Sequence, residues 1–485
     1  MDEFYLGSYC NYIDGEWVTP VSDTILEVYC PGNGALVSKV PDSSRQDVEA
    51  AAASSRRAFE EEDWAFNPRR RSSALSFWAR RMRENSATIA RALSLETGKP
   101  IAEARFEVNG AIGYLEYYAS AARTLYGSST AVDQNSLSVL SREPVGVVAG
   151  ITPWNYPITL MMRDLAPALA AGNAIIIKPA EQTTACTFEV IKLLDTVAEM
   201  PRGIVNAVSG RGNIAGNALV EHPEVDMVSF TGGVETGKRI MKTGADTMKK
   251  LSLELGGKSP NIIFADANME KALPFAMKAI FTNAGQLCTV GSRLLLEETI
   301  ADGFLSRMKA EAEKLKLGFG LEEDTQMGPV ISQRQMEKIL GYVEDGIRTG
   351  TLVTGGHRVT DGALEDGYFI APTIIKNPAH TSRVVQEEIF GPVLVAETFK
   401  TEEEAIALAN GTMYGLASAV WTKDIDRAMR VGRKLRAGSV WVNCYNKLFP
   451  ECETGGYKQS GVDRAGGVEG LMKYTEVKHL CVDFA

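Results

Sequence analysis

The middle of the chain opens with Val145-Gly-Val-Val-Ala-Gly150, a helix-length segment over 158–171, and Ala174-Ile-Ile-Ile-Lys178. The alternation continues with strands expected at 204–208 and 225–230 and helices at 183–199, 213–221 and 234–243. Short β-rich runs separated by helices predict βαβ units and a parallel sheet. A second alternating region follows residue 260, with strands expected at 261–264, 294–297 and 393–399. The pattern therefore predicts an α/β protein with two such regions.

The chain before the alternating region has another pattern. Asp14-Gly15 stands between two apolar stretches, which indicates a β-hairpin. We expect helices over 45–59, from Pro68 to the break at Gly98-Lys-Pro100, and over 103–123. Residues 125–144 are polar and β-branched and predict an extended arm.

The composition excludes several classes of protein. The 485 residues carry 51 Lys and Arg against 61 Asp and Glu, a net charge of −10, so no basic surface for nucleic acid is expected. Apolar runs are too short to span a membrane, and the acidic N-terminus does not resemble a signal peptide. Seven scattered cysteines without a C-x-x-C pair indicate a reducing, cytoplasmic setting. The four histidines lack metal-ligand spacing, so no metal site is expected.

One cysteine stands in a loop suited to catalysis. The segment Phe281-Thr-Asn-Ala-Gly-Gln-Leu-Cys-Thr-Val-Gly-Ser-Arg293 places Cys288 after a helix expected over 268–281 and between two glycines that permit tight turns. A free thiol has a pKa of about 8.5 and is mostly protonated at neutral pH. A catalytic Cys288 therefore needs a base, and also hydrogen-bond donors for an oxyanion. The alternative is that Cys288 is a small buried apolar residue, as most free cysteines are.

Glu254 is the candidate for that base. In Glu254-Leu-Gly-Gly-Lys258 two glycines follow the carboxylate at the end of an apolar strand, so the backbone can pass close to it. A half-buried glutamate has a raised pKa and can act as a general base. A lone glutamate is more often solvated, so this assignment depends on its neighbours in the fold.

Loops at the expected carboxyl ends of strands indicate a nucleotide site. Gly210-Arg-Gly212 and Thr231-Gly-Gly233 each separate a strand from a helix, where glycine lets the backbone approach a phosphate. Neither has the G-x-G-x-x-G spacing, and Arg239 stands where a P-loop needs Ser or Thr. Lys178 and Glu181 follow another strand, and a carboxylate there accepts the ribose hydroxyls of NAD and repels the 2′-phosphate of NADP. The alternative for this pair is a surface ion pair.

Seven motifs, in their order and spacing, resemble the aldehyde dehydrogenase superfamily, and the likeness covers almost the whole chain. They are Pro153-Trp-Asn155, Lys178-Pro-Ala-Glu181, Phe230-Thr-Gly232, Glu254-Leu-Gly-Gly-Lys258, Gly285-Gln-Leu-Cys-Thr289, Glu387-Glu-Ile-Phe-Gly-Pro392 and Gly455-Gly-Tyr-Lys-Gln-Ser-Gly461. The resemblance implies a Rossmann-type NAD-binding domain (1–124 and 145–256), a catalytic α/β domain (257–456), and a β oligomerisation arm with the C-terminal segment (125–144 and 457–485). It also implies a homodimer or homotetramer.

The resemblance gives these residues roles. Cys288 would be the nucleophile, Glu254 the base that activates water, and the Asn155 amide half of an oxyanion hole. The expected reaction is oxidation of an aldehyde to its carboxylic acid, with NAD rather than NADP, through a thiohemiacetal and a thioester. The implied cofactor-binding residues are Trp154, Lys178, Glu181, Gly212, Gly232, Gly233, Glu388 and Phe390. A non-catalytic NAD-binding scaffold and a cofactor-free thiol esterase are the competing classes.

Four positions depart from the family pattern. Asp164 and Ala465 replace a lysine and a glutamate that are thought to relay protons from the base. Glu254 is therefore expected to lose its proton in another way. Gly233 replaces a common serine beside the pyrophosphate, and Thr454 replaces an aromatic residue that often packs at the catalytic pocket.

The sequence leaves two substrate classes open. Arg163 stands where many relatives place a tryptophan in the substrate tunnel, and Tyr156 is the other expected substrate contact. Succinate-semialdehyde dehydrogenases hold the substrate carboxylate with an arginine at that position, but their second arginine is Thr282 here. Runs such as Trp441-Val-Asn-Cys-Tyr445 resemble betaine-aldehyde and amino-aldehyde dehydrogenases instead. A further alternative is that Arg163 pairs with an acidic residue and contacts no substrate.

Overall fold

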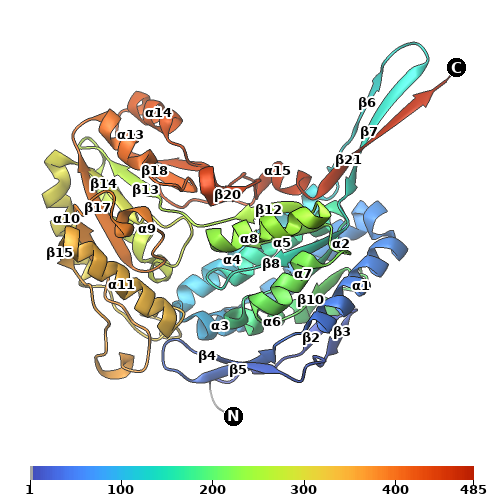
Figure 1. Cartoon of the computed structure of the whole chain (residues 1–485), viewed down its shortest axis with the longest axis horizontal. Coiled ribbons are helices and arrows are strands. Elements are labelled where there is room, and N and C mark those ends of the chain that lie inside the picture. Colours follow the sequence, from blue (N-terminus) through green and yellow to red (C-terminus); the bar gives the residue numbers. More distant parts are fainter. Residues whose placement is uncertain (1–3, 485) are drawn as a thin grey trace.

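The computed structural model describes residues 4–484 and has two large sheets covered by helices, with a narrow three-stranded arm that projects from one side (Figure 1). The larger sheet has the order β20-β12-β11-β8-β9-β10-β2-β3. Its strands are β20 (Gly461–Val462), β12 (Lys250–Glu254), β11 (Met227–Thr231), β8 (Val147–Ile151), β9 (Ala174–Lys178), β10 (Val205–Ala207), β2 (Asn11–Ile13) and β3 (Glu16–Val18). The five strands from β12 to β10 are parallel.

The second sheet has seven strands in the order β15-β16-β17-β14-β13-β18-β19. They are β15 (Thr351–Thr354), β16 (Thr373–Lys376), β17 (Val393–Phe399), β14 (Arg293–Glu297), β13 (Pro260–Ile263), β18 (Ala417–Trp421) and β19 (Ser439–Val442). A small sheet near the N-terminus contains β1 (Gly7–Ser8), β5 (Leu36–Pro41) and β4 (Ile25–Tyr29). The two large sheets confirm the expected α/β fold class.

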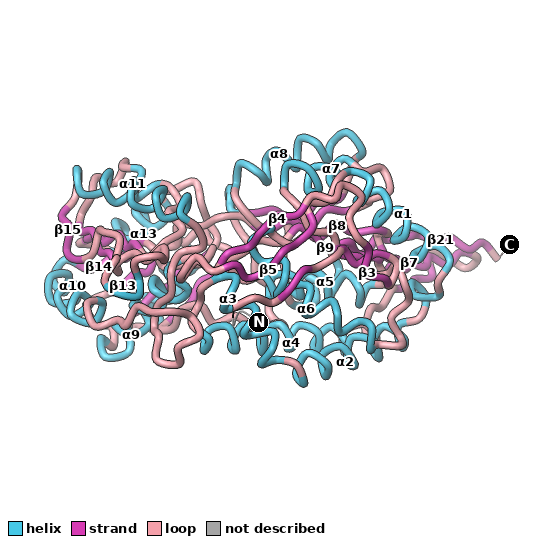
Figure 2. Tube along the Cα trace, turned by 90° about the horizontal axis from the view of Figure 1, so that it is seen from below, coloured by secondary structure: helices cyan, strands magenta, loops and turns pink. Residues whose placement is uncertain are grey.

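Helices cover both faces of the larger sheet, as Figure 2 shows for α8, α7 and α1 above the strands and α2, α4 and α6 below them. Strands β8 and β9 are buried along their whole length, which is why they read as continuous apolar runs. The helices are α1 (Arg45–Glu61), α2 (Pro68–Glu84), α3 (Ser86–Thr97), α4 (Ile101–Ala121), α5 (Pro157–Ala171), α6 (Thr184–Ile191), α7 (Asn217–Glu221), α8 (Val234–Gly244), α9 (Met269–Phe281), α10 (Glu298–Ala312), α11 (Gln333–Thr349), α12 (Arg383–Gln386), α13 (Glu402–Asn410), α14 (Ile425–Lys434) and α15 (Gly467–Met472).

Two helix predictions were wrong in their extent. The segment expected as one helix from Pro68 to Gly98 forms α2 and α3, because Asn85 leaves the helical conformation with φ −108° and ψ 12° between them. The helix expected over 183–199 ends as α-helix at Ile191 and continues only as a 3₁₀ turn to Thr196. The hairpin at Asp14-Gly15 is present, and both turn residues have the positive φ that a tight hairpin turn needs.

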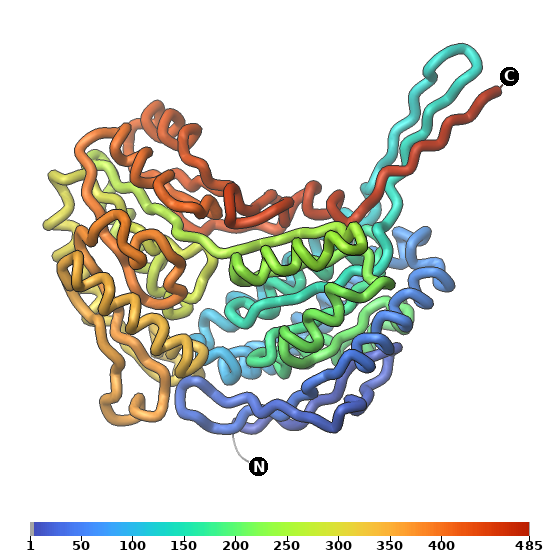
Figure 3. Tube along the Cα trace, viewed as in Figure 1, coloured from blue at the N-terminus to red at the C-terminus, as the bar shows by residue number. Residues whose placement is uncertain are grey.

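The arm consists of β6 (Ser128–Ala131), β7 (Ser136–Pro144) and the C-terminal β21 (Thr475–Asp483). Strand β21 pairs with β7 along its whole length, from Thr475 opposite Pro144 to Asp483 opposite Ser136. In Figure 3 the β6–β7 hairpin and the C-terminal strand extend together beyond the body of the molecule. Within residues 4–484 no helix is long and apolar enough to cross a membrane.

Candidate active site

The candidate site lies at the carboxyl edge of the larger sheet, where ligands bind in open α/β sheets. Strands β8, β11 and β12 are neighbours, and Thr231 lies opposite Glu254 in their register. Asn155 follows β8, Gly232 and Gly233 follow β11, and Glu254 ends β12. Three of the predicted loops are therefore brought to one edge by strand order alone.

A cavity of about 200 Å³ collects most of the predicted residues. Its lining includes Trp154, Asn155, Gly232, Gly233, Glu254, Cys288, Glu388 and Phe390. The cavity is also lined by Thr231, Leu160, Gln335 and Lys338. The last two lie on α11, and no sequence motif singled them out. Cys288 and Glu388 come from loops next to β14 and β17, so the second sheet supplies the predicted nucleophile to a cavity built on the first.

The loop before Cys288 takes an unusual left-handed path. Asn283 and Ala284 both have φ 50°, and Gly285 has φ 71°. A Cβ at Gly285 would stand 2.1 Å from the carbonyl oxygen of Gly391, so only glycine permits this packing. The turn leaves the Cys288 thiol half-buried in the cavity.

Burial raises the pKa of the Cys288 thiol to about 11, and Arg163 opposes the rise. Glu254 and Glu388 add to it, while the backbone N–H of Thr289 favours the thiolate. The thiol is therefore predominantly protonated at neutral pH in the protein without ligands.

The two glycines after Glu254 allow the close packing expected from the sequence. A Cβ at Gly256 would stand 2.3 Å from the Glu388 carboxylate, and a Cβ at Gly257 would stand 2.5 Å from the carbonyl oxygen of Cys288. The segment after β12 thus passes directly beside both the thiol loop and Glu388. This contact holds the Glu254 strand end and the Cys288 loop together at one cavity.

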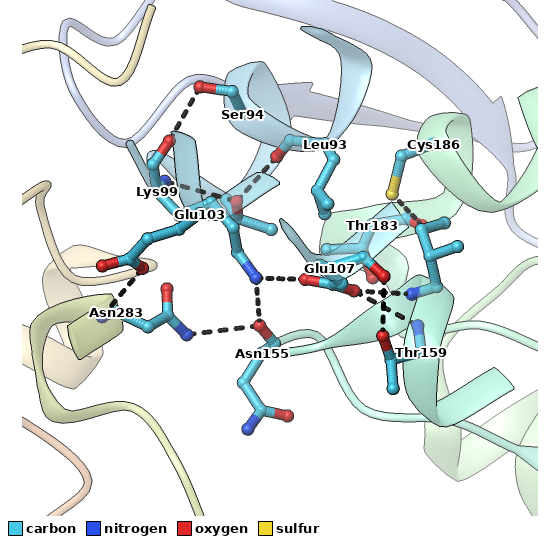
Figure 4. A network of polar contacts seen from close by, with 12 residues as sticks. Leu93, Ser94, Lys99, Glu103, Glu107, Asn155, Thr159, Thr183, Cys186 and Asn283 are labelled. Carbon is cyan, nitrogen blue, oxygen red and sulfur yellow. Dashed lines mark hydrogen bonds and ion pairs between the residues drawn. The ribbon is translucent and has the colours of Figure 1, made fainter. Parts of the chain in front are cut away.

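Asn155 is held by a buried polar network that sequence reasoning missed (Figure 4). Its side-chain Nδ2 donates to the carbonyl of Gln286 at 2.9 Å, which leaves a second N–H for another acceptor. The backbone carbonyl of Asn155 accepts hydrogen bonds from Lys99 Nζ at 2.8 Å and from Asn283 Nδ2 at 3.2 Å. Lys99 also pairs with Glu107, and both side chains are fully buried.

Two carboxylates of α4 tie this network to both loops. Glu107 accepts the backbone N–H of Ile158 at 2.9 Å and so caps the first turn of α5. Glu103 accepts the backbone N–H of Asn283 at 2.9 Å, and burial raises its pKa to about 7. The helical block before residue 125, which held few candidates for chemistry in the sequence, therefore positions the loops that carry the predicted oxyanion donors.

Replacing Lys99 by Met tests this support. It would leave Glu107 buried without its cation, a change that typically destabilises a protein by about 3–5 kcal/mol. We expect a lower thermal unfolding midpoint and a slower acylation step, since the Asn155 carbonyl loses its main donor. Calorimetry and pre-steady-state kinetics measure the two effects. Lys314→Met, which removes an exposed lysine paired with Glu311, is the matched control, and equal effects of both variants would contradict the prediction.

Glu254 is buried, with 7% of its surface exposed, and its Oε1 has no hydrogen-bond partner. Burial raises its pKa, Arg163 and Lys473 lower it, and Asp164 raises it. A buried carboxylate that lines a cavity and has one oxygen free of hydrogen bonds can accept a proton from water there.

The cofactor side of the cavity is bordered by aromatic rings and a carboxylate. The rings of Trp154 and Phe390 meet edge to face, with centroids 5.3 Å apart. Phe390 has φ 62°, and Gln335 on α11 fixes this strained position by donating to its carbonyl at 2.9 Å. Glu388 accepts the backbone N–H of Gly257 at 3.0 Å, and burial raises its pKa to about 7.

Three predicted cofactor residues lie outside that cavity. Gly212 lines a second cavity of about 200 Å³ together with residues of α7 and α8. Lys178 ends β9 and donates from Nζ to the Pro179 carbonyl at 2.7 Å, and burial lowers its pKa to about 8. Glu181 begins the 3₁₀ turn that follows β9.

The two predicted substrate residues also lie outside the cavity lining. Arg163 is 8% exposed and faces Glu254 and Thr231. The ring of Tyr156 lies under the Lys99 ammonium, 3.9 Å from Nζ. Substrate contact by either residue stays a prediction.

Comparison with known proteins agrees with this arrangement. The model of the "Aldehyde dehydrogenase family" matches residues 17–480. The chain belongs to the aldehyde dehydrogenase family. It is 44% identical to the betaine aldehyde dehydrogenase of Bacillus subtilis over 97% of this chain and 96% of that protein. It is 39% identical to an aldehyde dehydrogenase of Emericella nidulans over 96% of this chain and 93% of that protein.

A solved structure of an aldehyde dehydrogenase is equally similar. The betaine aldehyde dehydrogenase of Staphylococcus aureus, in complex with NAD⁺, superposes with a TM-score of 0.96 at 40% identity, covering 98% of this chain and 95% of that one. The family match confirms the resemblance inferred from the seven motifs. This protein is therefore an oxidoreductase that acts on the aldehyde group.

Proposed function

We propose that this aldehyde dehydrogenase oxidises its substrate to the carboxylic acid with NAD, using Cys288 as nucleophile and Glu254 as base. The observation that carries the proposal is the single cavity that joins the half-buried thiol, the buried carboxylate and Asn155. A scaffold without catalysis has no need for these three groups in one cavity. The solved relative that contains NAD⁺ supports the choice of cofactor.

The residues present fit a dinucleotide. At Gly233 an added Cβ would meet nothing within 4 Å, so a side chain there would enter the space beside the sheet edge. Glu388 uses one oxygen for Gly257 and keeps the other for a ribose hydroxyl. Trp154, Glu388 and Phe390 would lie on the nicotinamide side. Gly212, Gly232 and Gly233 would lie along the pyrophosphate, and Lys178 and Glu181 would hold the adenosine ribose. When bound, NAD supplies the hydride acceptor for the oxidation.

Acylation uses the thiol and the oxyanion donors. The Cys288 thiol first loses its proton to solvent; the thiolate then adds to the aldehyde carbon, and the carbonyl electrons move to oxygen. The free N–H of the Asn155 amide and the backbone N–H at Cys288 stabilise this oxyanion. Loss of hydride from the carbon then leaves a thioester on Cys288.

Hydrolysis uses Glu254. Its carboxylate accepts a proton from water, the hydroxide adds to the thioester carbon, and the Cys288 thiolate leaves. The product is the carboxylic acid, and the proton remains on Glu254 until it is exchanged with solvent. Because burial raises the pKa of Glu254, its carboxylate is a stronger proton acceptor than a solvated one.

The border of the site favours a cationic substrate. The segment 445–455 begins beside the thiol loop, where Asn446 accepts from Thr289 at 2.8 Å, and ends at Gly455 beside Glu254. It carries the exposed carboxylates Glu451 and Glu453 against one exposed cation, Lys447. The negative charges of both carboxylates raise the pKa of Tyr117 on α4, and Glu451 also raises the pKa of Tyr114. Acidic and aromatic groups together suit an ammonium head, so we favour amino- or quaternary-ammonium aldehydes over anionic semialdehydes.

The assay measures NADH formation with betaine aldehyde, its uncharged carbon isostere and succinate semialdehyde, each with NAD and with NADP. We expect the highest kcat/KM for the cation with NAD, because Glu451 attracts it and Glu181 repels the 2′-phosphate. Glu451→Gln should reduce the preference for the cation and leave the isostere unchanged. A preference for succinate semialdehyde would favour the Arg163 clamp instead, and hydrolysis of esters without any aldehyde oxidation would favour the esterase.

We also infer a homodimer or homotetramer built through the arm. Strand β21 is an edge strand, and its exposed apolar side chains, like that of Phe484 after it, are unusual for a surface that stays in water. They are Val477, Leu480, Val482 and Phe484.

The domain division at residues 124, 145, 256 and 456 likewise stays a proposal. It is supported by the sheets, because the strands within 147–254 and those within 260–442 belong to different sheets.

A further inference from the structure

Helix α5 is almost entirely buried, yet it carries two adjacent charges. Every residue from Leu160 to Ala171 is buried, and Arg163 and Asp164 are the charged ones among them. Charges in such a position need partners, since an unpaired buried ion is strongly unfavourable. The residues that contact Arg163 and Asp164 indicate what each charge does.

Arg163 faces the end of the sheet that carries the base. Its Nη1 lies 3.9 Å from Glu254 Oε2, and its Nη2 donates to Thr231 Oγ1 at 2.9 Å. Thr231 and Glu254 lie opposite each other on neighbouring strands, so the guanidinium spans both. Its Nε has no partner, and Arg163 is absent from the lining of the catalytic cavity.

Asp164 faces the other way, toward the C-terminal segment. It lies 3.6 Å from Lys473 Nζ and accepts from the Tyr474 hydroxyl at 3.2 Å. Lys473 also donates to Ser252 Oγ at 2.9 Å, two residues before Glu254 on β12. The four charges therefore form two pairs on the buried face of β11 and β12.

We infer that Arg163 is a positioning residue, which holds the Glu254 carboxylate against the sheet and supplies the positive charge beside Glu254 and Cys288, and that it is not a binding group for the substrate. The inference rests on the proposed roles of those two residues. Asp164, where the family pattern has a lysine, pairs with Lys473, and the cation that α5 places beside Glu254 is Arg163.

Charged groups around the base act in opposite directions. Arg163, Lys473 and Arg464 lower the pKa of Glu254 against the effect of burial, and Asp164 raises it. Arg163 is the main opposing charge for Cys288 as well, against Glu254 and Glu388. Burial disfavours the charge of Arg163 itself, but Glu254 and Asp164 raise its pKa, so it stays protonated.

The test compares Arg163→Met with Asp164→Asn. Loss of Arg163 should raise the pKa of Glu254 and Cys288, so the rising limb of kcat against pH should move up by about one to three units. Loss of Asp164 should lower the pKa of Glu254, so the rising limb should move to lower pH. Alkylation of Cys288 by iodoacetamide at pH 8 should slow at least about tenfold in Arg163→Met, since one unit of pKa is a tenfold change in thiolate. Arg163→Lys should lie between wild type and Arg163→Met.

Opposite shifts cannot arise from general loss of stability, and alkylation needs no turnover. Arg80→Met, which removes an exposed arginine of α2, is the matched control and should leave both profiles unchanged. An unchanged pH profile with a higher KM for anionic aldehydes alone would overturn the inference in favour of the substrate clamp. Shifts in the same direction for both variants would overturn it too. Turnover retained in Cys288→Ala would instead refute the proposed function, whatever Arg163 does.

Discussion

Cys288→Ala is expected to lose at least about 10⁴-fold in kcat for aldehyde oxidation, because removal of a nucleophile deletes the covalent pathway and leaves only binding and oxyanion donors. NAD binding should persist, since the residues proposed to hold the cofactor surround the thiol and do not include it. Stopped-flow NADH absorbance gives the rate, and quenching of tryptophan fluorescence by NAD gives the affinity.

The matched control is Cys452→Ser, which removes another free thiol, one that is exposed and outside the cavity. It should keep wild-type turnover. Loss of activity in this variant and not in Cys288→Ala would assign the chemistry to another thiol. The unmodified protein offers a second check, since burial raises the Cys288 pKa to about 11. Its alkylation in the absence of ligands should quicken about tenfold per pH unit between pH 7 and 10.

The sequence identified the parts of the site that local chemistry determines. Strands 174–178 and 393–399 have the predicted bounds because each is an apolar run that proline limits at one end. Cys288 and Glu254 were found because glycine-rich motifs surround them, and the structure shows what Gly256, Gly257 and Gly285 permit. Asn155 was found through the resemblance of Pro153-Trp-Asn155 to the family motif. Strand order then brings these loops together without any further information.

What the sequence did not indicate depends on contacts between distant residues. Lys99 and Glu107 are an ordinary lysine and glutamate until the fold places both, fully buried, under the Asn155 carbonyl. Arg163 could be read from the sequence as a substrate clamp or as half of an ion pair. Only the folded chain shows the partner, because it brings Glu254 at the end of β12 to within 3.9 Å of Arg163 on α5. The break at Asn85 was missed because no proline or glycine marks it.

Glu254→Gln should separate the two halves of the reaction. Acylation needs the thiol and the oxyanion donors, so one equivalent of NADH per active site should form rapidly. Hydrolysis needs a base, and an amide cannot accept the proton from water, so the thioester should persist and steady turnover should fall by about 10²–10⁴-fold. Rapid-quench mass spectrometry should show the acyl group on Cys288.

The glutamine keeps the volume of Glu254 and removes its charge beside Arg163. The pKa of Cys288 should then fall, since Glu254 raises it and Glu388 is then the remaining carboxylate that opposes Arg163 there. The burst should therefore be no slower than in wild type at neutral pH, while the steady rate is lost. Glu323→Gln, which neutralises an exposed carboxylate paired with Arg105 and outside the cavity, should leave hydrolysis of the thioester intact. Steady turnover without a burst in Glu254→Gln would show that another group activates the water, and the buried carboxylate would then serve only to balance Arg163.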